Sequence, residues 1–308
     1  MIGRRHATET ESADAAARTV DAVDAVIQGP HGPIPVRRYS ASVGTALTGT
    51  APTETAPIVW VHGGAFVKGD LDLPETHDVA LALAGAGFSV TTVDYRLASI
   101  PGLSRLRRGG PTGFRRATTP TRRIHYPVPV DDVVAVVRAV QAETGDRVIL
   151  GGASAGACLS AAAVLRLADG GASPLGGGFF AYGIFHARLP ERSREVRSRL
   201  RGRRRFTHIP PLLNAVNRVY AGSRAALADP QAFPGGHPLP GFPPALLIDA
   251  ESDSMRASGE QFARELAAAR GSVQYHVLPG TDHAFLNRPG EAGFAAGIRL
   301  IVDWARRL

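Results

Sequence analysis

The feature that most constrains the fold is an alternation of short apolar runs with helical segments. Each apolar run ends at glycines or polar residues, as buried parallel strands do. The runs cover residues 57–64, 88–95, 147–152, 176–185, 243–253 and 272–280. The helical segments cover residues 74–87, 128–145, 155–168, 258–271 and 290–308. Because strand and helix alternate over at least five units, we predict an α/β fold with a mainly parallel sheet and helices on both faces, in a single domain over residues 1–308.

The rest of the chain has a weaker pattern. Residues 34–39 are typical of a further strand, and residues 10–28 have a weak helical period. Residues 40–57 are rich in Thr, Ala, Pro and Gly, which is typical of a loop. Residues 99–123 show no clear period, and residues 188–235 mix arginine and proline with short helical pieces. Since parallel sheets place their chemistry at the carboxyl ends of strands, the polar residues that directly follow the predicted strands are the candidates for a site.

A serine flanked by glycines follows the third buried strand. Residues 152–156 read Gly-Ala-Ser-Ala-Gly, which fits the pattern G-x-S-x-G, and an alanine-rich helix comes next. A sharp strand-to-helix turn places the serine at unfavourable backbone dihedrals and crowds the residues two before and two after it, which must then be very small. The helix directs its free amides and positive dipole end at the serine. A glycine-rich turn with a capping serine is the alternative, but the position after a strand favours Ser154 as a nucleophile.

A serine nucleophile needs a base and an acid that orients the base. Of the ten histidines, His283 lies just after the last predicted strand, where it can reach Ser154. Asp253 follows the preceding strand, 30 residues before the histidine. The order Ser154, Asp253, His283 is the one expected of the α/β-hydrolase fold. We therefore predict these three residues as a catalytic triad.

The acid has three rivals. Glu251 is the realistic one, because it too lies at the end of the strand run. Asp249 lies inside that run, and Asp282 is adjacent to His283 and points away from it in this interpretation. The alternative interpretation of His283 is an ordinary histidine on a surface loop.

Backbone amides that could bind an oxyanion occur after the first buried strand. Residues 62–66 read His-Gly-Gly-Ala-Phe, and glycines let the backbone approach a substrate closely. The amide of Ala155, which follows the nucleophile, is a further donor. His62 is more consistent with a structural residue that orients this loop than with a catalytic one.

Together these motifs resemble the hormone-sensitive-lipase-like family of α/β-hydrolases. The resemblance starts near residue 34, reaches the C-terminus, and also includes the sequences VDYRLA, HYPVPVDD, ESDSMR and GTDHAF. It implies a serine carboxylesterase with a helical cap formed by residues 1–30 and 188–235. It also implies that Ser154, Asp253 and His283 are catalytic. The implied oxyanion hole has the amides of Gly64, Ala65 and Ala155 as donors, and Gly63 supports them.

The chain departs from the family pattern at several positions. Ala65 stands where the family usually has a third glycine, and its Cβ narrows the site. Ala153 stands where an aspartate usually precedes the nucleophile, so a supporting hydrogen bond is missing there. Ala257 replaces another frequent acid. Residues 99–123 interrupt the pattern on the side of the active site. These departures concern rate and substrate more than the class of reaction.

The net charge of +8 is unevenly distributed. Residues 99–123 hold seven arginines and no acid, and residues 188–205 hold nine arginines against Glu191 and Glu195, so the other residues carry a net charge of −6. Much of this reflects a compositional preference, because Lys68 is the only lysine. If the two segments share one rim over the site, they attract substrates with a carboxylate or phosphate. A binder of nucleic acid or of an anionic surface is a rival, disfavoured by the acidic remainder and the lack of a binding motif.

The location and the function follow from these features. The chain has one cysteine, no apolar run of about 18 residues and no apolar signal-peptide core, so we expect a cytoplasmic location. We expect an esterase of short-chain acyl esters without metal or cofactor. The alternatives are a deacetylase or amidase of a small natural product, and a hydrolase-fold ligand-binding protein without catalysis. The expected partner is a small ester, not a nucleic acid, and a homodimer is compatible with the sequence.

Overall fold

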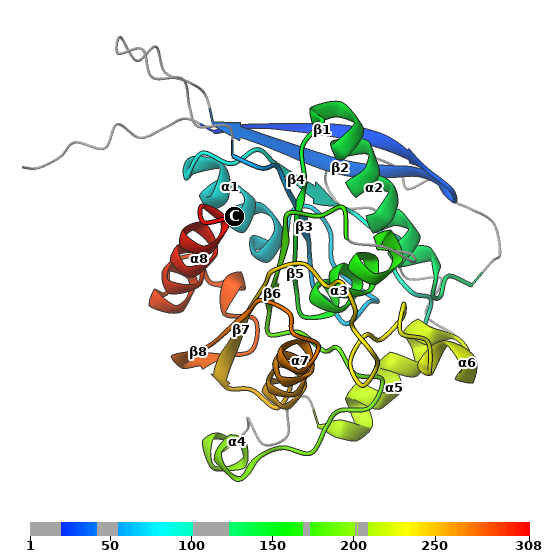
Figure 1. The fold of residues 1–308 in the computed structure, drawn as a ribbon, viewed down its shortest axis with the longest axis vertical. Helices are drawn as coiled ribbons and strands as arrows, with labels where there is room; N and C mark the ends of the chain where they lie inside the picture. Colours follow the sequence, from blue (N-terminus) through cyan, green and yellow to red (C-terminus); the bar gives the residue numbers. More distant parts are fainter. Residues whose placement is uncertain (1–19, 42–54, 101–122, 169–172, 201, 203–208) are drawn as a thin grey trace, which may run out of the picture.

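The computed structural model describes residues 20–41, 55–100, 123–168, 173–200, 202 and 209–308. In this part of the chain an eight-stranded sheet forms the centre, with strands in the order β1-β2-β4-β3-β5-β6-β7-β8 (Figure 1). The strands are β1 (Val20–Gly29), β2 (Gly32–Ala41), β3 (Ile58–Val61), β4 (Val90–Val93), β5 (Ile149–Ala153), β6 (Gly177–Ala181), β7 (Ala245–Ser252) and β8 (Val273–Asp282). The helices are α1 (Pro74–Gly85), α2 (Val128–Thr144), α3 (Ala155–Leu167), α4 (Arg194–Arg199), α5 (Pro210–Ala221), α6 (Arg224–Leu227), α7 (Arg256–Ala268) and α8 (Ala292–Ala305), with a 3₁₀ turn at η2 (Phe285–Asn287).

The strand pairs from β4 to β8 are parallel, and the β1–β2 and β2–β4 pairs are antiparallel. Strands β3 to β6 are buried along their whole length, which explains why their residues are apolar or small, apart from Thr91 and Thr92 of β4. The predicted α/β fold with a mainly parallel sheet is confirmed. As a result, the carboxyl ends of β5, β7 and β8 lie along one edge of the sheet.

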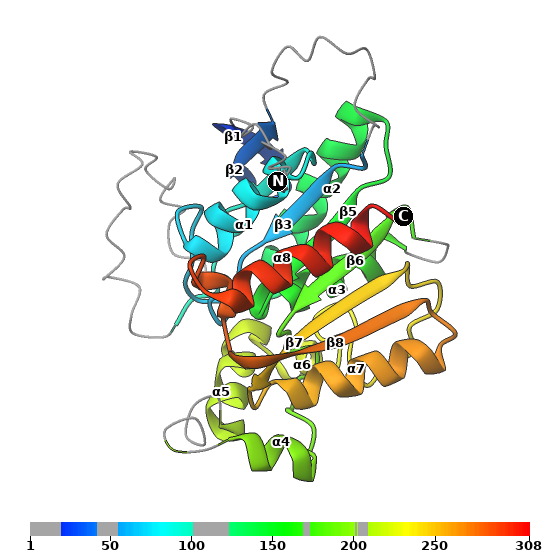
Figure 2. The same cartoon turned by 90° about the vertical axis from the view of Figure 1, so that its left-hand side faces the viewer.

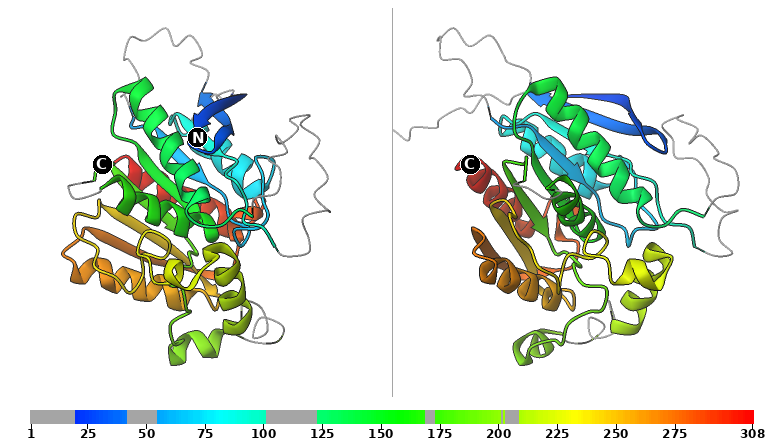
Figure 3. Two further views of the ribbon diagram at one scale, coloured as in Figure 1. Left: turned by 90° about the vertical axis from the view of Figure 1, so that its right-hand side faces the viewer. Right: turned by 45° about the vertical axis from the view of Figure 1, so that its right-hand side comes forward.

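Two layers of helices cover the sheet. Alternate residues of β3 show the division: Val59 and Val61 pack into one apolar cluster, and Ile58 and Trp60 into another. The first cluster includes residues of α2, α3 and α7, and the second includes residues of α1 and α8. Figure 2 shows α1 and α8 on one side of the sheet, and Figure 3 shows α2 and α3 on the other.

The helix suggested by the weak period over residues 10–28 is wrong for residues 20–28, the part that the structure describes. Residues from Val20 onward form β1, which pairs with β2 over ten positions. Most of β1 is exposed, with Val23 at 61% and Val26 at 43%, and only Ile27 is buried. An edge strand exposed on both faces has no period-two pattern, so pairing with β2, not local sequence, decides its conformation. Residues 1–19, the rest of the first expected cap segment, lie outside the described residues.

The second expected cap segment, residues 188–235, contains the short helices α4, α5 and α6. Helix α5 packs on the loop after β3, where the Tyr220 ring stacks on Phe66 at 4.1 Å. Most of the arginine-rich segment 99–123 lies outside the described residues, as does most of the expected loop 40–57. None of the described helices has the length and apolar character needed to cross a membrane.

Candidate active site

Ser154 occupies the turn between β5 and α3 with a positive φ of 53°. This conformation is rare for a residue with a side chain, and surrounding contacts must hold it. A Cβ added to Gly152 would overlap the carbonyl of Gly156, and a Cβ added to Gly156 would overlap the carbonyl oxygens of Val61 and His62. The small residues of this stretch therefore provide steric clearance for the tight turn.

Ser154, His283 and Asp253 form a continuous chain of hydrogen bonds. The Oγ of Ser154 lies 3.1 Å from Nε2 of His283, and Nδ1 of His283 lies 2.6 Å from Oδ2 of Asp253. The other oxygen, Oδ1 of Asp253, accepts the amide of Met255 at 2.9 Å. A neutral imidazole that donates Nδ1–H to the carboxylate keeps its Nε2 lone pair free for the serine hydroxyl. The three residues come together because β5, β7 and β8 end at the same edge.

The aspartate controls the charge of the histidine. Burial lowers the pKa of His283, but the charge of Asp253 and its hydrogen bond outweigh burial and raise that pKa above its ordinary value. The side chain of Asp253 is fully buried, so water screens this interaction little. A buried carboxylate therefore stabilises the imidazolium form that a general base reaches after it accepts a proton.

The rival acids have other partners. Oδ2 of Asp249 accepts the hydroxyl of Tyr275 at 3.0 Å, and burial, together with the charge of Asp253, raises the pKa of Asp249 well above its ordinary value. Glu251 accepts the amide of Gly280 and pairs with Arg199. In the structure it is Asp253, and not Glu251, that contacts the histidine.

The loop after β3 lies against the serine. A Cβ on Gly63 would come within 2.9 Å of the Cβ of Ser154. Gly64 and Ala65 have positive φ values of 110° and 54°, so the alanine adopts a backbone conformation that favours glycine. Within the described ranges, the amides of Gly64, Ala65 and Ala155 donate to no protein acceptor. The amide of Gly63, in contrast, donates to Oε1 of Glu75 at 2.6 Å and is occupied.

A family model described as alpha/beta hydrolase fold matches residues 120–287, more than half of the chain. The chain belongs to the alpha/beta hydrolase family.

Named relatives agree with this membership. The hydrolase is 30% identical to the "Carboxylic ester hydrolase LipN" of Mycobacterium tuberculosis, over 93% of this chain and 70% of that protein. It is 29% identical to "Esterase LipI" of the same organism, over 87% and 76%. Among solved structures, an esterase of Pyrobaculum calidifontis has a TM-score of 0.73 and 25% identity over 93% of this chain and 85% of that one. The esterase LipW of Mycobacterium marinum has a TM-score of 0.69 and 26% identity, over 93% and 81%. The expected resemblance to hormone-sensitive-lipase-like esterases is thereby confirmed.

The hydrolase also contains a buried carboxylate that the sequence analysis missed. Glu75, in the first turn of α1, is only 2% exposed. Its Oε1 accepts the amide of Gly63, and its Oε2 accepts the hydroxyl of Tyr182 at 2.6 Å and the side-chain amide of Asn287 at 2.9 Å. The ring of Tyr182 stands edge-on to His283, with centroids 5.0 Å apart. One carboxylate thus connects the glycine loop with Tyr182, which contacts the histidine ring, and with Asn287, four residues after the histidine.

The position before the nucleophile, Ala153, offers no side-chain hydrogen bond. In this chain, Glu75 of the helix that follows the glycine loop is an acid beside that loop. Burial, followed by the nearby charge of Glu75, raises the pKa of Tyr182 well above its ordinary value, so the phenol stays a donor. The only sequence signal was an acid directly after the proline that starts a helix, which is common on exposed first turns.

His62 has the expected structural position. It is fully buried, its Nδ1 lies 2.7 Å from the carbonyl oxygen of Gly63, and its ring stacks on Tyr95 at 4.5 Å. Burial lowers its pKa, which favours the neutral ring. Across the described residues, no group of three or more His, Cys, Asp or Glu is arranged to hold a metal ion.

Proposed function

We propose that the chain is a serine carboxylesterase that hydrolyses esters with short acyl chains through an acyl-enzyme. The single observation that carries the proposal is the hydrogen-bonded sequence Ser154–His283–Asp253, with distances of 3.1 and 2.6 Å. The names of the relatives support hydrolysis of ester bonds as the class of reaction.

In the first half of the proposed reaction, Oγ of Ser154 attacks the acyl carbon while its proton moves to Nε2 of His283. Asp253 keeps Nδ1–H oriented and stabilises the imidazolium. The amides of Gly64, Ala65 and Ala155 donate to the oxyanion of the tetrahedral intermediate, with Gly63 holding the loop in place. As the intermediate collapses, the bond to the alcohol oxygen breaks and the alcohol takes the proton from His283.

In the second half, water attacks the acyl-serine and gives its proton to His283. The intermediate breaks its bond to Oγ, which takes the proton back, and the carboxylic acid leaves. Two observations support the preference for short acyl chains. The described helices in the expected cap are short, with 6, 12 and 4 residues. The Cβ of Ala65 also adds bulk where a glycine would leave space.

The test is a series of p-nitrophenyl esters with increasing acyl-chain length, measured on the parent protein and on Ser154→Ala. The parent is expected to cleave the acetate and butyrate fastest, and Ser154→Ala is expected to lose the activity. Ser160→Ala, in α3, is the matched control, because its hydroxyl donates to the carbonyl oxygen of Gly151 and not to the reacting groups. A Ser154→Ala protein as active as the parent would contradict the mechanism. A parent that binds esters without turnover would favour the ligand-binding alternative.

A further inference from the structure

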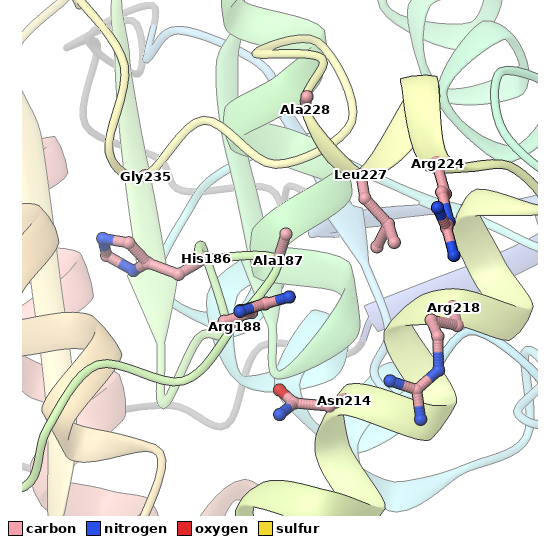
Figure 4. Close-up of a pocket in the computed structure, with 9 residues that line it drawn as sticks. All are labelled: His186, Ala187, Arg188, Asn214, Arg218, Arg224, Leu227, Ala228 and Gly235. Atoms are coloured by element: carbon pink, nitrogen blue, oxygen red, sulfur yellow. The ribbon is translucent and has the colours of Figure 1, made fainter.

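A hollow whose described lining residues include none of Ser154, His283 and Asp253 is rich in arginine. This pocket, with a volume of about 820 Å³, lies between the loop after β6, helices α5 and α6, and the loop before β7. Among the described residues, nine line the pocket; three of these are Arg188, Arg218 and Arg224, and none of the nine is acidic. Figure 4 shows the three arginines around one open space, each on a different element, with Asn214 below them. None of the nine belongs to the Ser154–His283–Asp253 group.

The three guanidinium groups are not neutralised from within the described chain. Arg188, Arg218 and Arg224 are exposed and form no ion pair with a described residue. Other arginines of this region are paired: Arg197 with Glu191, and Arg199 with Glu195 and Glu251. Arg188, Arg218 and Arg224 therefore place positive charge at the pocket that no described acid neutralises, and these like charges oppose each other unless an anion is present.

Two carboxylates that adjoin lining residues are held by other donors. Glu265 lies beside the pocket residue His186, 3.2 Å from its Nε2, and accepts the amide of Gly236 at 3.0 Å. Asp229, next to the lining residue Ala228, accepts the hydroxyl of Tyr126 at 2.8 Å and the amide of Gln231 at 2.8 Å. Neither acid lines the pocket. The positive lining therefore has no acidic counterpart among the described residues.

Asn214 adds a polar side chain to the lining of the pocket. Its side-chain oxygen is buried without a hydrogen-bond partner in the described part of the chain. Buried polar atoms are nearly always paired, so an atom at a pocket without a partner among the described residues is available to a bound molecule. An anionic oxygen accepts hydrogen bonds, so Asn214 would face it with its NH2 group, which exchanges places with the oxygen when the amide turns over.

We propose that this pocket binds the anionic group of a small molecule, a carboxylate or a phosphate. Guanidinium groups match both anions, because each presents a fork of N–H donors. The volume suits a small organic molecule. The wall of the pocket also contacts the glycine loop, because Tyr220 of α5 stacks on Phe66 and stands edge-on to Phe233. The anion is either the acidic part of an ester substrate or a separate ligand, and the two share one recognition chemistry.

The first arm of the test measures binding. Titration calorimetry at low salt with pyrophosphate, and separately with citrate, is run on the full chain and on Ser154→Ala, so that hydrolysis plays no part. Arg218→Gln and Arg188→Gln are expected to weaken binding at least tenfold. Arg138 is exposed on α2 and forms no ion pair with a described residue, so Arg138→Gln is the control with the same change of charge. The proposal is overturned if the parent protein binds neither anion. It is also overturned if the parent and Arg218→Gln bind both anions with equal affinity.

The second arm separates the two sources of the anion. The ratio kcat/KM is measured for p-nitrophenyl acetate and for the mono-p-nitrophenyl ester of succinic acid. If Arg218→Gln lowers only the value for the anionic ester, the pocket binds the acidic part of a substrate. If both values stay unchanged while pyrophosphate or citrate binding is lost, the pocket binds a separate anionic ligand. The binding titrations of the first arm need no catalysis. They therefore test this proposal even if the protein has no esterase activity.

Discussion

Ser154 combines a reactive position with an unfavourable backbone. Its φ of 53° is tolerated because β5 and α3 fix the residues on both sides. The amide of Ser154 donates to the carbonyl oxygen of Ala181 at 2.9 Å, which ties the turn to β6. Tight packing around the turn maintains the strained backbone of Ser154 and leaves no room for side chains larger than glycine at the flanking positions. Substitution of these glycines tests whether the turn depends on this packing.

Gly156→Ala is expected to impair both stability and activity. The added Cβ would overlap the carbonyl oxygens of Val61 and His62, which belong to backbone and cannot move away as a flexible side chain does. We expect a loss of about 1–3 kcal/mol in the free energy of unfolding, which is typical of overpacking, and a large fall in kcat. Gly85→Ala, where an added Cβ meets nothing within 4 Å, is the matched control. Denaturant unfolding and ester hydrolysis measure both effects, and equal behaviour of the two variants would refute the steric argument.

The pH dependence of hydrolysis is expected to follow the pKa of His283. The base must be neutral to accept the serine proton, so kcat/KM should rise as the pH increases through a pKa that lies above the ordinary histidine value. Asp253→Asn removes the negative charge that raises the pKa of His283, whereas the burial that lowers this pKa remains. The pKa of His283 should therefore fall. The rate should also fall, by roughly 10⁴-fold, because an amide favours the wrong tautomer. Histidine NMR titration reports the shift directly, and an unchanged pKa would show that Asp253 does not control the base.

At the scale of elements, the start of α1 determines the position of the glycine loop. Glu75→Gln retains the size of the side chain but places an amide donor among the donors Gly63 N, Tyr182 Oη and Asn287 Nδ2. We expect kcat to fall tenfold or more with little change in KM, because oxyanion donors act mainly in the transition state. The pKa of His283 should also fall, since the charge of Glu75 helps to raise it.

The control for this variant is Glu143→Gln, which removes an exposed acid of α2 paired with Arg38. Both variants lose one negative charge, so a general electrostatic effect would change them alike. If Glu75→Gln lowers thermal stability but leaves kcat and the pKa of His283 at parent values, Glu75 is structural only and does not position the loop.

Much of the sheet could be predicted from sequence, because buried parallel strands have continuous apolar runs. The candidate site was predictable for a related reason: Ser154, Asp253 and His283 each follow such a strand closely. Two features were not predictable. Val23 and Val26 of β1 are exposed, so the strand lacks an apolar face in its sequence. Glu75 looks like an ordinary acid of a first helical turn, and only its contacts with Tyr182, directly after β6, and with Asn287 of η2 show its buried role.

At the scale of the whole molecule, the sheet separates two apolar layers that share its strands. Both tryptophans, Trp60 and Trp304, lie in the layer of α1 and α8, and the single cysteine, Cys158, lies in the layer of α2 and α3. Trp60 and Cys158 are fully buried. The chain therefore carries one natural probe of packing on each face of the sheet.

The proposal that the chain is a single domain predicts that both layers unfold together. Because β3 and β5 contribute side chains to both faces, one layer cannot unfold without exposing the other side of the same strands. Tryptophan fluorescence and Cys158 labelling by a thiol reagent should therefore give the same denaturant midpoint. The native thiol should react slowly, since burial removes access and raises its pKa. Cys158→Ala serves as the blank for labelling and should keep the fluorescence transition. Labelling that is complete before the tryptophans respond would show that the helical layer of α2 and α3 opens independently, and would contradict a single cooperative unit.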